Sequence, residues 1–224
     1  MIKSKMSRGE RFWYPFITGT VLAGIFIFLF FKILDSVLEQ ASLARFDLVV
    51  FNSLDAIRTP ILNDIMTLFT LLGNWEIVIL GVIFSCVFFA GRKRWNKVIA
   101  LIVSPAIGEV FVFIVKNLVQ RERPITISQF IIENGFSFPS AHSFVALSFY
   151  GLLTYFAFRH ARRKRIKLGI LIAGIVLILV IGFSRIYLGV HWASDVLASY
   201  ASGAAWLALV ITALEIFNGN ENVK

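Results

Sequence analysis

The chain has 224 residues, of which 58% are hydrophobic and 15% aromatic, and its mean hydropathy is +0.81. Soluble domains are usually about 45–50% apolar, so this composition excludes an ordinary soluble protein and predicts a membrane protein. The formal net charge of +9 does not indicate nucleic-acid binding, because the basic residues fall in short segments between apolar runs. Cys86 is the only cysteine, which excludes an internal disulfide and a cysteine-based metal cluster.

Long apolar runs predict transmembrane helices and exclude a β-barrel, since a spanning helix needs about 20 mainly apolar residues. Six such runs lie at residues 12–33, 77–90, 98–119, 142–158, 168–187 and 192–217. The second run is short for a full crossing, so we expect its helix to begin nearer Leu71, with Asn74 and Glu76 at the level of the headgroups. The first run exceeds the apolar core of a cleavable signal, about 7–15 residues, and we expect it to stay in the mature protein.

The basic residues predict how these helices are oriented in the cell membrane. They gather before the first run, between the second and third, and between the fourth and fifth. The three clusters are Lys3, Lys5, Arg8 and Arg11; Arg92, Lys93, Arg94 and Lys97; and Arg159, Arg162, Arg163, Lys164, Arg165 and Lys167. Cytoplasmic segments carry an excess of lysine and arginine, so all three clusters are expected in the cytoplasm. Both termini are then cytoplasmic, and the segments near 35–75, 117–141 and 185–191 face the extracytoplasmic side.

The first outer segment, residues 35–74, mixes charged and apolar residues in a way that predicts short amphipathic helices on the membrane surface. Pro60 is expected to break this segment, because proline removes a backbone donor and clashes with the preceding turn. No repeat or low-complexity stretch is visible. We therefore expect one membrane domain over residues 1–224, with an all-α fold of six transmembrane helices and short surface helices on the outer side.

Three groups of polar residues lie near the outward ends of the predicted helices. They are Lys116 with Arg123-Pro124, then Pro139-Ser140-Ala141-His142, and finally Ser184-Arg185 with His191 and Asp195. The predicted topology brings these ends to one surface, so we expect the three cations Lys116, Arg123 and Arg185 to converge there. Lysine and arginine bind phosphate through charge-assisted hydrogen bonds, and their charge stabilises the transition state of phosphoryl transfer.

The two histidines among these residues indicate how a bound phosphate reacts. Asp195 follows His191 by four residues and, if the segment is helical, shares a face with it, so its carboxylate is expected to hold one ring nitrogen and leave the other free to attack. His142 belongs to another helix and suits the role of general acid toward the leaving group and then base toward water. Ser140 occupies an N-cap position, where the free N–H groups of the next turn add anion contacts.

This set of residues resembles the three-motif signature of the type-2 phosphatidic acid phosphatase superfamily, a family of lipid phosphatases, over residues 116–195. The resemblance implies that His142 is the acid and that His191 with Asp195 forms the nucleophile pair. It also implies a set of phosphate-binding residues, namely Lys116, Arg123, Ser140, Ala141 and Arg185, with the backbone of His142. The family usually has glycine where this chain has Ala141, a departure that affects the geometry of the loop.

The sequence therefore predicts an integral membrane phosphatase that works at the extracytoplasmic face through a phosphohistidine on His191. The family implies substrates such as phosphatidylglycerol phosphate, phosphatidic acid, diacylglycerol pyrophosphate or an isoprenoid pyrophosphate of bacterial wall synthesis, and the sequence does not choose among them. We expect no metal and no cofactor, since cations replace an acidic metal-binding constellation. The expected partners are the substrate and membrane lipids, not nucleic acid, and no oligomeric state is indicated.

Two other functions compete with this interpretation. A non-enzymatic lipid-phosphate carrier or flippase would bind a headgroup with the same cations and do no chemistry. Soluble relatives of the family hold vanadate in a similar pocket for halide oxidation, which six apolar runs disfavour. Taken singly, the polar residues also have structural explanations, since Lys116 and Arg123 could snorkel at the interface. Glu109 lies inside the third run and is more typical of a hydrogen bond between helices, or of a protonated side chain, than of direct chemistry.

Overall fold

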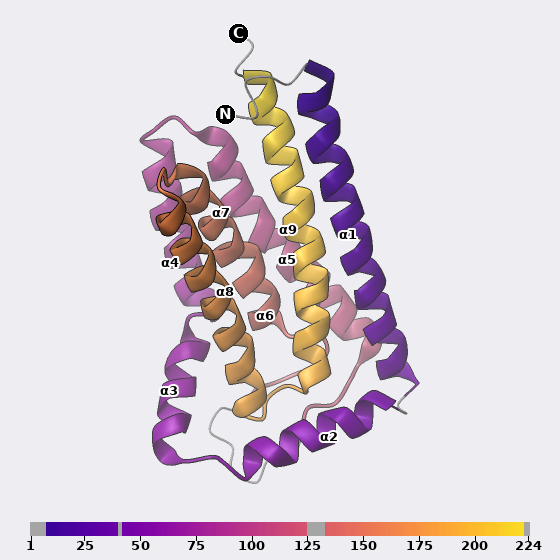
Figure 1. Cartoon of the computed structure of the whole chain (residues 1–224). Coiled ribbons are helices and arrows are strands. Elements are labelled where there is room, and N and C mark those ends of the chain that lie inside the picture. Colours follow the sequence, from indigo (N-terminus) through magenta and orange to yellow (C-terminus); the bar gives the residue numbers. More distant parts are fainter. Residues whose placement is uncertain (1–7, 40–41, 125–132, 222–224) are drawn as a thin grey trace.

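The computed structural model describes residues 8–39, 42–124 and 133–221, which form helices joined by short loops (Figure 1). In chain order the elements are α1 (Arg8–Leu38), α2 (Ser42–Asp55), α3 (Pro60–Leu71), α4 (Trp75–Ala90), α5 (Trp95–Val119), α6 (Ala141–Val145), the π-helical turn η2 (Ala146–Tyr150), α7 (Gly151–His160), α8 (Lys164–Tyr187) and α9 (Ala193–Glu221). The all-α class predicted from the sequence is confirmed.

Among the described residues, five segments are long and apolar enough to cross a membrane, namely Phe12–Leu38, Trp95–Val119, Ala141–His160, Lys164–Tyr187 and Ala193–Phe217. A sixth crossing forms if α3 and α4 are counted together, since the two helices pass the same test as a pair bent by 45°. Each of the six apolar runs therefore corresponds to a helical segment. The second run differs from the others because it is only one arm of a bent pair.

The bend between α3 and α4 corrects one expectation, since the helix of the second run begins at Trp75 and not nearer Leu71. Asn74 precedes it with extended backbone (φ −69°, ψ 144°), and its side chain makes no capping bond to α4. That side chain is instead engaged by His142, whose Nε2 lies 2.7 Å from Asn74 Oδ1. The helix is thus interrupted where the chain passes a predicted catalytic residue.

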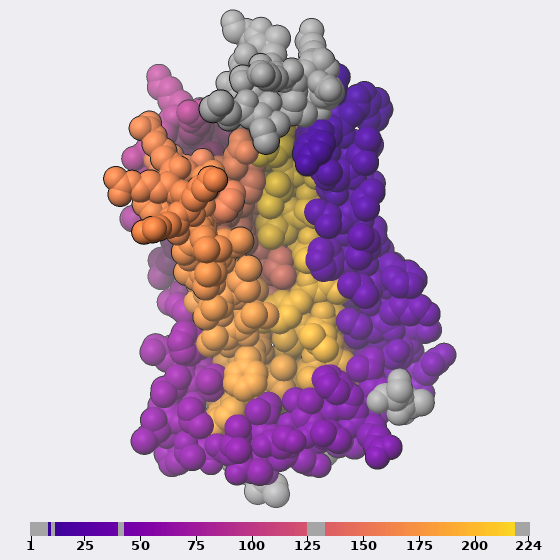
Figure 2. Space-filling model, in the orientation of Figure 1, coloured from indigo at the N-terminus to yellow at the C-terminus, as the bar shows by residue number. Residues whose placement is uncertain are grey.

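The predicted break at Pro60 is confirmed, since Pro60 is the first residue of α3. Proline suits this position because the first N–H groups of a helix have no intrahelical partner. Thr59 caps the helix, and its Oγ1 accepts a hydrogen bond from Leu62 N at 3.3 Å. Helix α2 lies across one end of the bundle and covers it (Figures 1 and 2), while α3 packs against α8.

The fourth predicted run is helical from Ala141 to His160, but the π-helical turn η2 interrupts its α-helical pattern. Such turns are rare and are frequently found beside functional sites. Tyr150 ends this turn, and its hydroxyl donates to Leu72 O at 2.7 Å. The turn is therefore tied to the bend between α3 and α4.

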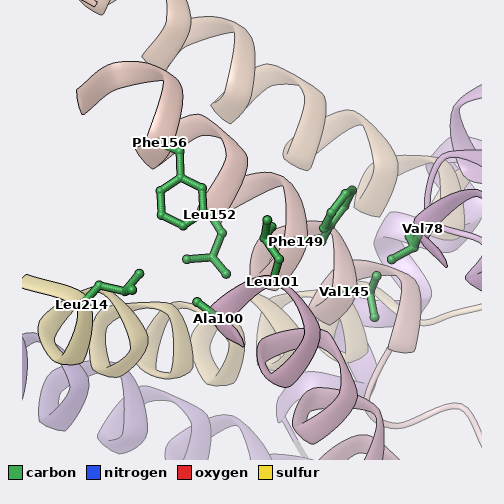
Figure 3. Packing of buried hydrophobic residues seen from close by; sticks show 8 residues of the cluster. All are labelled: Val78, Ala100, Leu101, Val145, Phe149, Leu152, Phe156 and Leu214. Atoms are coloured by element: carbon green, nitrogen blue, oxygen red, sulfur yellow. The ribbon is translucent and has the colours of Figure 1, made fainter. Parts of the chain in front are cut away.

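The core of the bundle is formed where α4, α5 and α9 meet the continuous helical segment of α6, η2 and α7 (Figure 3). It contains Val78, Ala100, Leu101, Val145, Phe149, Leu152, Phe156 and Leu214. Lipid tails are as apolar as these side chains, so close packing rather than exclusion from water holds the helices together. Gly108 of α5 permits such packing, because a Cβ there would lie 2.3 Å from a ring carbon of Phe144. This contact places the start of α6 directly against α5.

The described parts of the three basic clusters lie at one end of the bundle. The start of α1 and the loops between α4 and α5 and between α7 and α8 share this end, together with the end of α9 (Figure 1). The polar groups singled out in the sequence lie at the other end, where α5 and α8 finish and α6 and α9 begin. The fold thus separates the basic loops from the predicted site by the length of the bundle.

Candidate active site

Four helix ends supply the site. Lys116 lies in the last turn of α5 and Arg185 in the last turn of α8, while His142 and Asp195 lie in the first turns of α6 and α9. His191 belongs to the short connection between α8 and α9. The structure therefore brings all three predicted groups to one end of the bundle, although they are separated by many residues along the chain.

His191 is 2% exposed and lies between an anion and a cation. Its Nδ1 is 3.4 Å from Asp195 Oδ2, and its Nε2 is 3.4 Å from Arg123 Nη1. One ring nitrogen thus faces the carboxylate and the other faces a predicted phosphate ligand. Burial lowers the pKa of His191 well below its usual range, and the charges of Arg185, Arg123 and Lys116 lower it further. The imidazole is therefore neutral at neutral pH, as a nucleophile requires.

Asp195 is fully buried and is held from several sides. Its Oδ2 accepts a hydrogen bond from Trp192 N at 2.9 Å, which resembles the reach of an N3 acid back to the start of its helix. The segment from His191 to Asp195 is not helical throughout, because α9 begins only at Ala193, so the helical condition for a shared face is not met. The pair meets instead across the turn that opens α9. The capping role and the contact with His191 use the same carboxylate.

His142 belongs to α6, a different element from the one that carries His191. Its Nε2 is held by Asn74 Oδ1, which leaves the other ring nitrogen free for proton exchange. Arg185 and His191 lie close enough to influence it electrostatically. The two histidines therefore belong to one site, which the proposed division of labour between them requires.

The three predicted phosphate ligands converge, but each already has protein partners. Lys116 Nζ donates to the carbonyls of Phe136 and Ser137. Arg123 donates to Val190 O at 2.7 Å and Gly135 O at 3.0 Å.

Arg185 is 1% exposed, donates to Thr70 Oγ1 at 2.6 Å and forms an ion pair with Glu133. Its Nε is buried and has no hydrogen-bond partner among the described residues. An anion-binding group with a spare buried donor fits a site that receives a phosphate oxygen.

The comparison with known proteins agrees with this geometry. The sequence profile of the PAP2 superfamily matches residues 97–217, which include every predicted site residue. Phosphatidylglycerophosphatase B of Bacillus subtilis (strain 168) is 34% identical over 187 residues, which cover 82% of this chain and 91% of the relative. The chain belongs to the PAP2 superfamily. The resemblance seen in the sequence is thereby confirmed, and the protein is a membrane-embedded phosphatase.

Two solved structures extend the comparison of this PAP2 protein to three dimensions. The crystal structure of the first transmembrane PAP2 type phosphatidylglycerolphosphate phosphatase from Bacillus subtilis has a TM-score of 0.78 at 26% identity and covers 91% of this chain and 98% of its own. Aquifex aeolicus LpxE has a TM-score of 0.58 at 25% identity and covers 73% of this chain and 93% of its own. The helical arrangement is therefore shared with other membrane members of the superfamily.

The second motif of this PAP2 protein differs in detail from the expectation. Ser140 occupies the N-cap position of α6, but its side chain makes no capping hydrogen bond. Its Oγ instead accepts a hydrogen bond from Ser143 Oγ at 3.0 Å. Ala141, which stands where the superfamily usually has glycine, is the half-exposed first residue of α6. The N–H groups of this first turn have no intrahelical acceptor and remain candidates for contact with phosphate.

Arg121 is a residue whose role the sequence did not reveal. Its guanidinium donates to Asp195 Oδ1 and to Asp47 Oδ2, each at 2.6 Å, and to Ser194 Oγ at 2.7 Å. Asp47 lies on α2 and is 1% exposed, although the sequence placed it on an amphipathic surface helix. The only signal in the sequence was one more arginine in an outer segment. This network ties α2 to the carboxylate that faces His191.

Three further side chains around the site were also missed. Thr70 of α3 and Asn74 bond to Arg185 and His142, and Glu133 bonds to two of the predicted phosphate ligands. No spacing along the chain links them to the motifs, since their contacts depend on how the helices pack. Glu109, by contrast, is exposed on α5 and forms no hydrogen bond or ion pair with another described residue. The hydrogen bond between helices that the sequence suggested for Glu109 is not seen.

Gly73 supports the site by leaving room for His142. A Cβ at this position would lie 2.8 Å from His142 Cδ2 and 3.0 Å from Ile181 Cγ2. Gly73→Ala is expected to push the imidazole away from Asn74 and to lower kcat by about 10-fold to 100-fold, because small misplacements of catalytic groups carry costs of this size. Steady-state phosphate release measures the effect.

The matched control is Gly24→Ala, since a Cβ on Gly24 of α1 meets no atom within 4 Å. This variant is expected to retain the kcat of the parent protein. If both variants showed the same kcat, Gly73 would have no part in placing His142.

Proposed function

We propose that this protein hydrolyses the terminal phosphate of a lipid phosphate or lipid pyrophosphate through a phosphohistidine on His191. The observation that carries the proposal is the position of the His191 ring, with Nδ1 toward Asp195 and Nε2 toward Arg123. The His191 ring then lies between its orienting carboxylate and a predicted phosphate-binding cation. A carrier that only holds a headgroup does not need this arrangement.

In the first step, the lone pair of His191 Nε2 attacks phosphorus, and the bond from phosphorus to the leaving oxygen breaks. His142 in its protonated form gives that oxygen its proton. Asp195 stabilises the positive charge that the His191 ring gains when Nε2 is phosphorylated. Lys116, Arg123 and Arg185 offset the negative charge on the other phosphate oxygens.

In the second step, a water molecule attacks phosphorus and the bond between phosphorus and nitrogen breaks. His142, now neutral, accepts a proton from this water and regains its starting form. Inorganic phosphate leaves and His191 is restored as the neutral imidazole. The site therefore returns to its initial protonation state after each turnover.

We propose that the site faces the extracytoplasmic side. Support comes from the basic loops at the opposite end of the bundle, which lysine and arginine statistics assign to the cytoplasm. The names of the relatives from Bacillus subtilis favour phosphatidylglycerol phosphate as the first substrate to test. Phosphatidic acid and isoprenoid pyrophosphates present the same terminal phosphate and belong in the same panel.

The test is phosphate release from a panel of these lipids by the purified protein in detergent, with and without a chelator of divalent cations. We expect release from at least one lipid and no loss of activity with the chelator, because Lys116, Arg123 and Arg185 supply the charge that a metal would otherwise provide. His191→Ala serves as the blank and should release no phosphate. Activity that vanished with the chelator and returned with a divalent ion would contradict the mechanism, and lipid transfer that survived in His191→Ala would indicate a carrier.

A further inference from the structure

Glu133 occupies the position where the predicted site should receive an anion. Its Oε1 pairs with Arg185 Nη2, and its Oε2 lies 3.5 Å from Arg123 Nη2. These two guanidinium groups are the ones expected to bind the phosphate of the substrate. A single carboxylate therefore bridges two predicted phosphate ligands.

The other anions near the site do not compete for these cations. Asp195 and Asp47 are both paired with Arg121, which is not one of the predicted phosphate ligands. Lys116 donates to backbone carbonyls. Glu133 is therefore the carboxylate that a phosphate group has to displace from Arg123 and Arg185.

The Glu133 side chain is also placed so that it can move away from the two arginines. Its side chain is 25% exposed, whereas the Arg185 side chain beneath it is 1% exposed. The arginine stays buried in the bundle, and the carboxylate has a path to solvent. Displacement then exchanges one charge-assisted hydrogen-bonding partner of the arginines for another without unfolding a helix.

We propose that Glu133 is an internal competitor that sets the minimum affinity an anion needs to enter the site, and that it thereby keeps the phosphodiester headgroups of bulk lipid out. This inference rests on the proposed function. Competition with a tethered group lowers the apparent affinity of every anion by the same factor, because only the open fraction of the protein binds ligand. A terminal phosphate monoester carries close to two negative charges and three free oxygens, and retains useful affinity after this loss.

A phosphodiester carries one negative charge and two free oxygens, so it gains little by replacing a carboxylate. This matters for an enzyme in a bilayer, because phosphodiester lipids surround the site at far higher concentration than any lipid monophosphate. It also matters for release of product, since dephosphorylated phosphatidylglycerol phosphate is itself a phosphodiester. Glu133 in this sense sets the affinity threshold of the site, for monoesters and diesters alike, and is not a catalytic residue.

The experiment compares the parent protein with Glu133→Gln and Glu133→Ala, using methyl phosphate as the monoester probe and dimethyl phosphate as the diester probe. Binding is measured directly, as the rise in melting temperature with ligand at constant ionic strength. We expect both variants to bind both probes about tenfold more tightly, since a charged hydrogen-bonding partner is replaced by a neutral one or removed. Glu122→Gln is the control, because it makes the same change in charge at an exposed position of the same outer segment.

Turnover gives the second measurement. In detergent free of phosphodiester lipid, Glu133→Gln should have a lower KM for the lipid monophosphate than the parent protein. Added phosphatidylglycerol should inhibit Glu133→Gln at concentrations that leave the parent protein unaffected. Unchanged or weaker binding of methyl phosphate in both Glu133 variants would overturn the inference. Because binding is measured without turnover, that result is distinct from failure of the proposed function, which would show as no phosphate release from any lipid.

Discussion

His142→Ala is expected to be phosphorylated once and then to stall when the substrate has a leaving group that needs no proton, such as p-nitrophenol. The first step proceeds because nitrophenolate leaves unaided. The second step slows by about 10²-fold to 10⁴-fold, because no general base activates the water. Rapid mixing should show a burst of nitrophenolate close to one equivalent per protein, followed by a slow steady rate.

The matched variant His191→Ala should show no burst, and its steady rate should fall by at least about 10³-fold, as expected on removal of a nucleophile. The phosphoryl group retained by His142→Ala should be labile to acid and stable to alkali, as for a phosphorus–nitrogen bond. His160→Ala is the control, since His160 is exposed at the end of α7 and lies at the other end of the bundle. A burst in His191→Ala, or a retained phosphoryl group stable to acid, would show that another residue is the nucleophile.

Arg121→Leu should lower both the free energy of unfolding and kcat, because one ion-pair network supports the fold and the carboxylate that faces His191. The arginine pairs with Asp47 and Asp195, which are 1% and 0% exposed, so its removal leaves two buried carboxylates without their cation. Breaking a buried ion pair from one side usually costs about 3–5 kcal/mol. Unfolding in mixed micelles measures this cost.

Arg121 touches Asp195 and not the predicted phosphate ligands, so Arg121→Leu should lower kcat while KM changes little. A purely structural role would not produce this division, and Arg121→Lys should recover part of kcat by restoring the charge. Arg159→Leu is the control, because the Arg159 side chain is 48% exposed and its pair with Glu215 is expected to contribute at most about 1 kcal/mol. If Arg121→Leu matched Arg159→Leu in both stability and kcat, the ion pairs of Arg121 with Asp47 and Asp195 would contribute neither to folding nor to catalysis.

The spans and the motif residues could be predicted from the sequence because their signals are local. Twenty apolar residues in a row predict a membrane helix whatever its neighbours are, and clusters of lysine and arginine predict an orientation. His142, His191 and Arg185 were recognisable because basic and imidazole side chains are costly near a membrane and have few structural uses there. The bend at Gly73 and Asn74 was not predicted, and the partner of Asn74 at this bend is His142 on another helix, which the local sequence does not indicate.

Amino-acid order by itself determined that this chain is a helical membrane protein, and it shows which histidine has a carboxylate four residues away. It also predicted which helix ends take part in the phosphate chemistry. Packing of the helices decided the rest: that Arg121 joins α2 to Asp195, that Asn74 holds His142, and that Glu133 lies between Arg123 and Arg185. Each of these contacts joins residues of separate elements, and it forms only because the packing of the helices brings those residues close together. Apolar periodicity and motif spacing do not predict such distances, because both describe only positions along the chain.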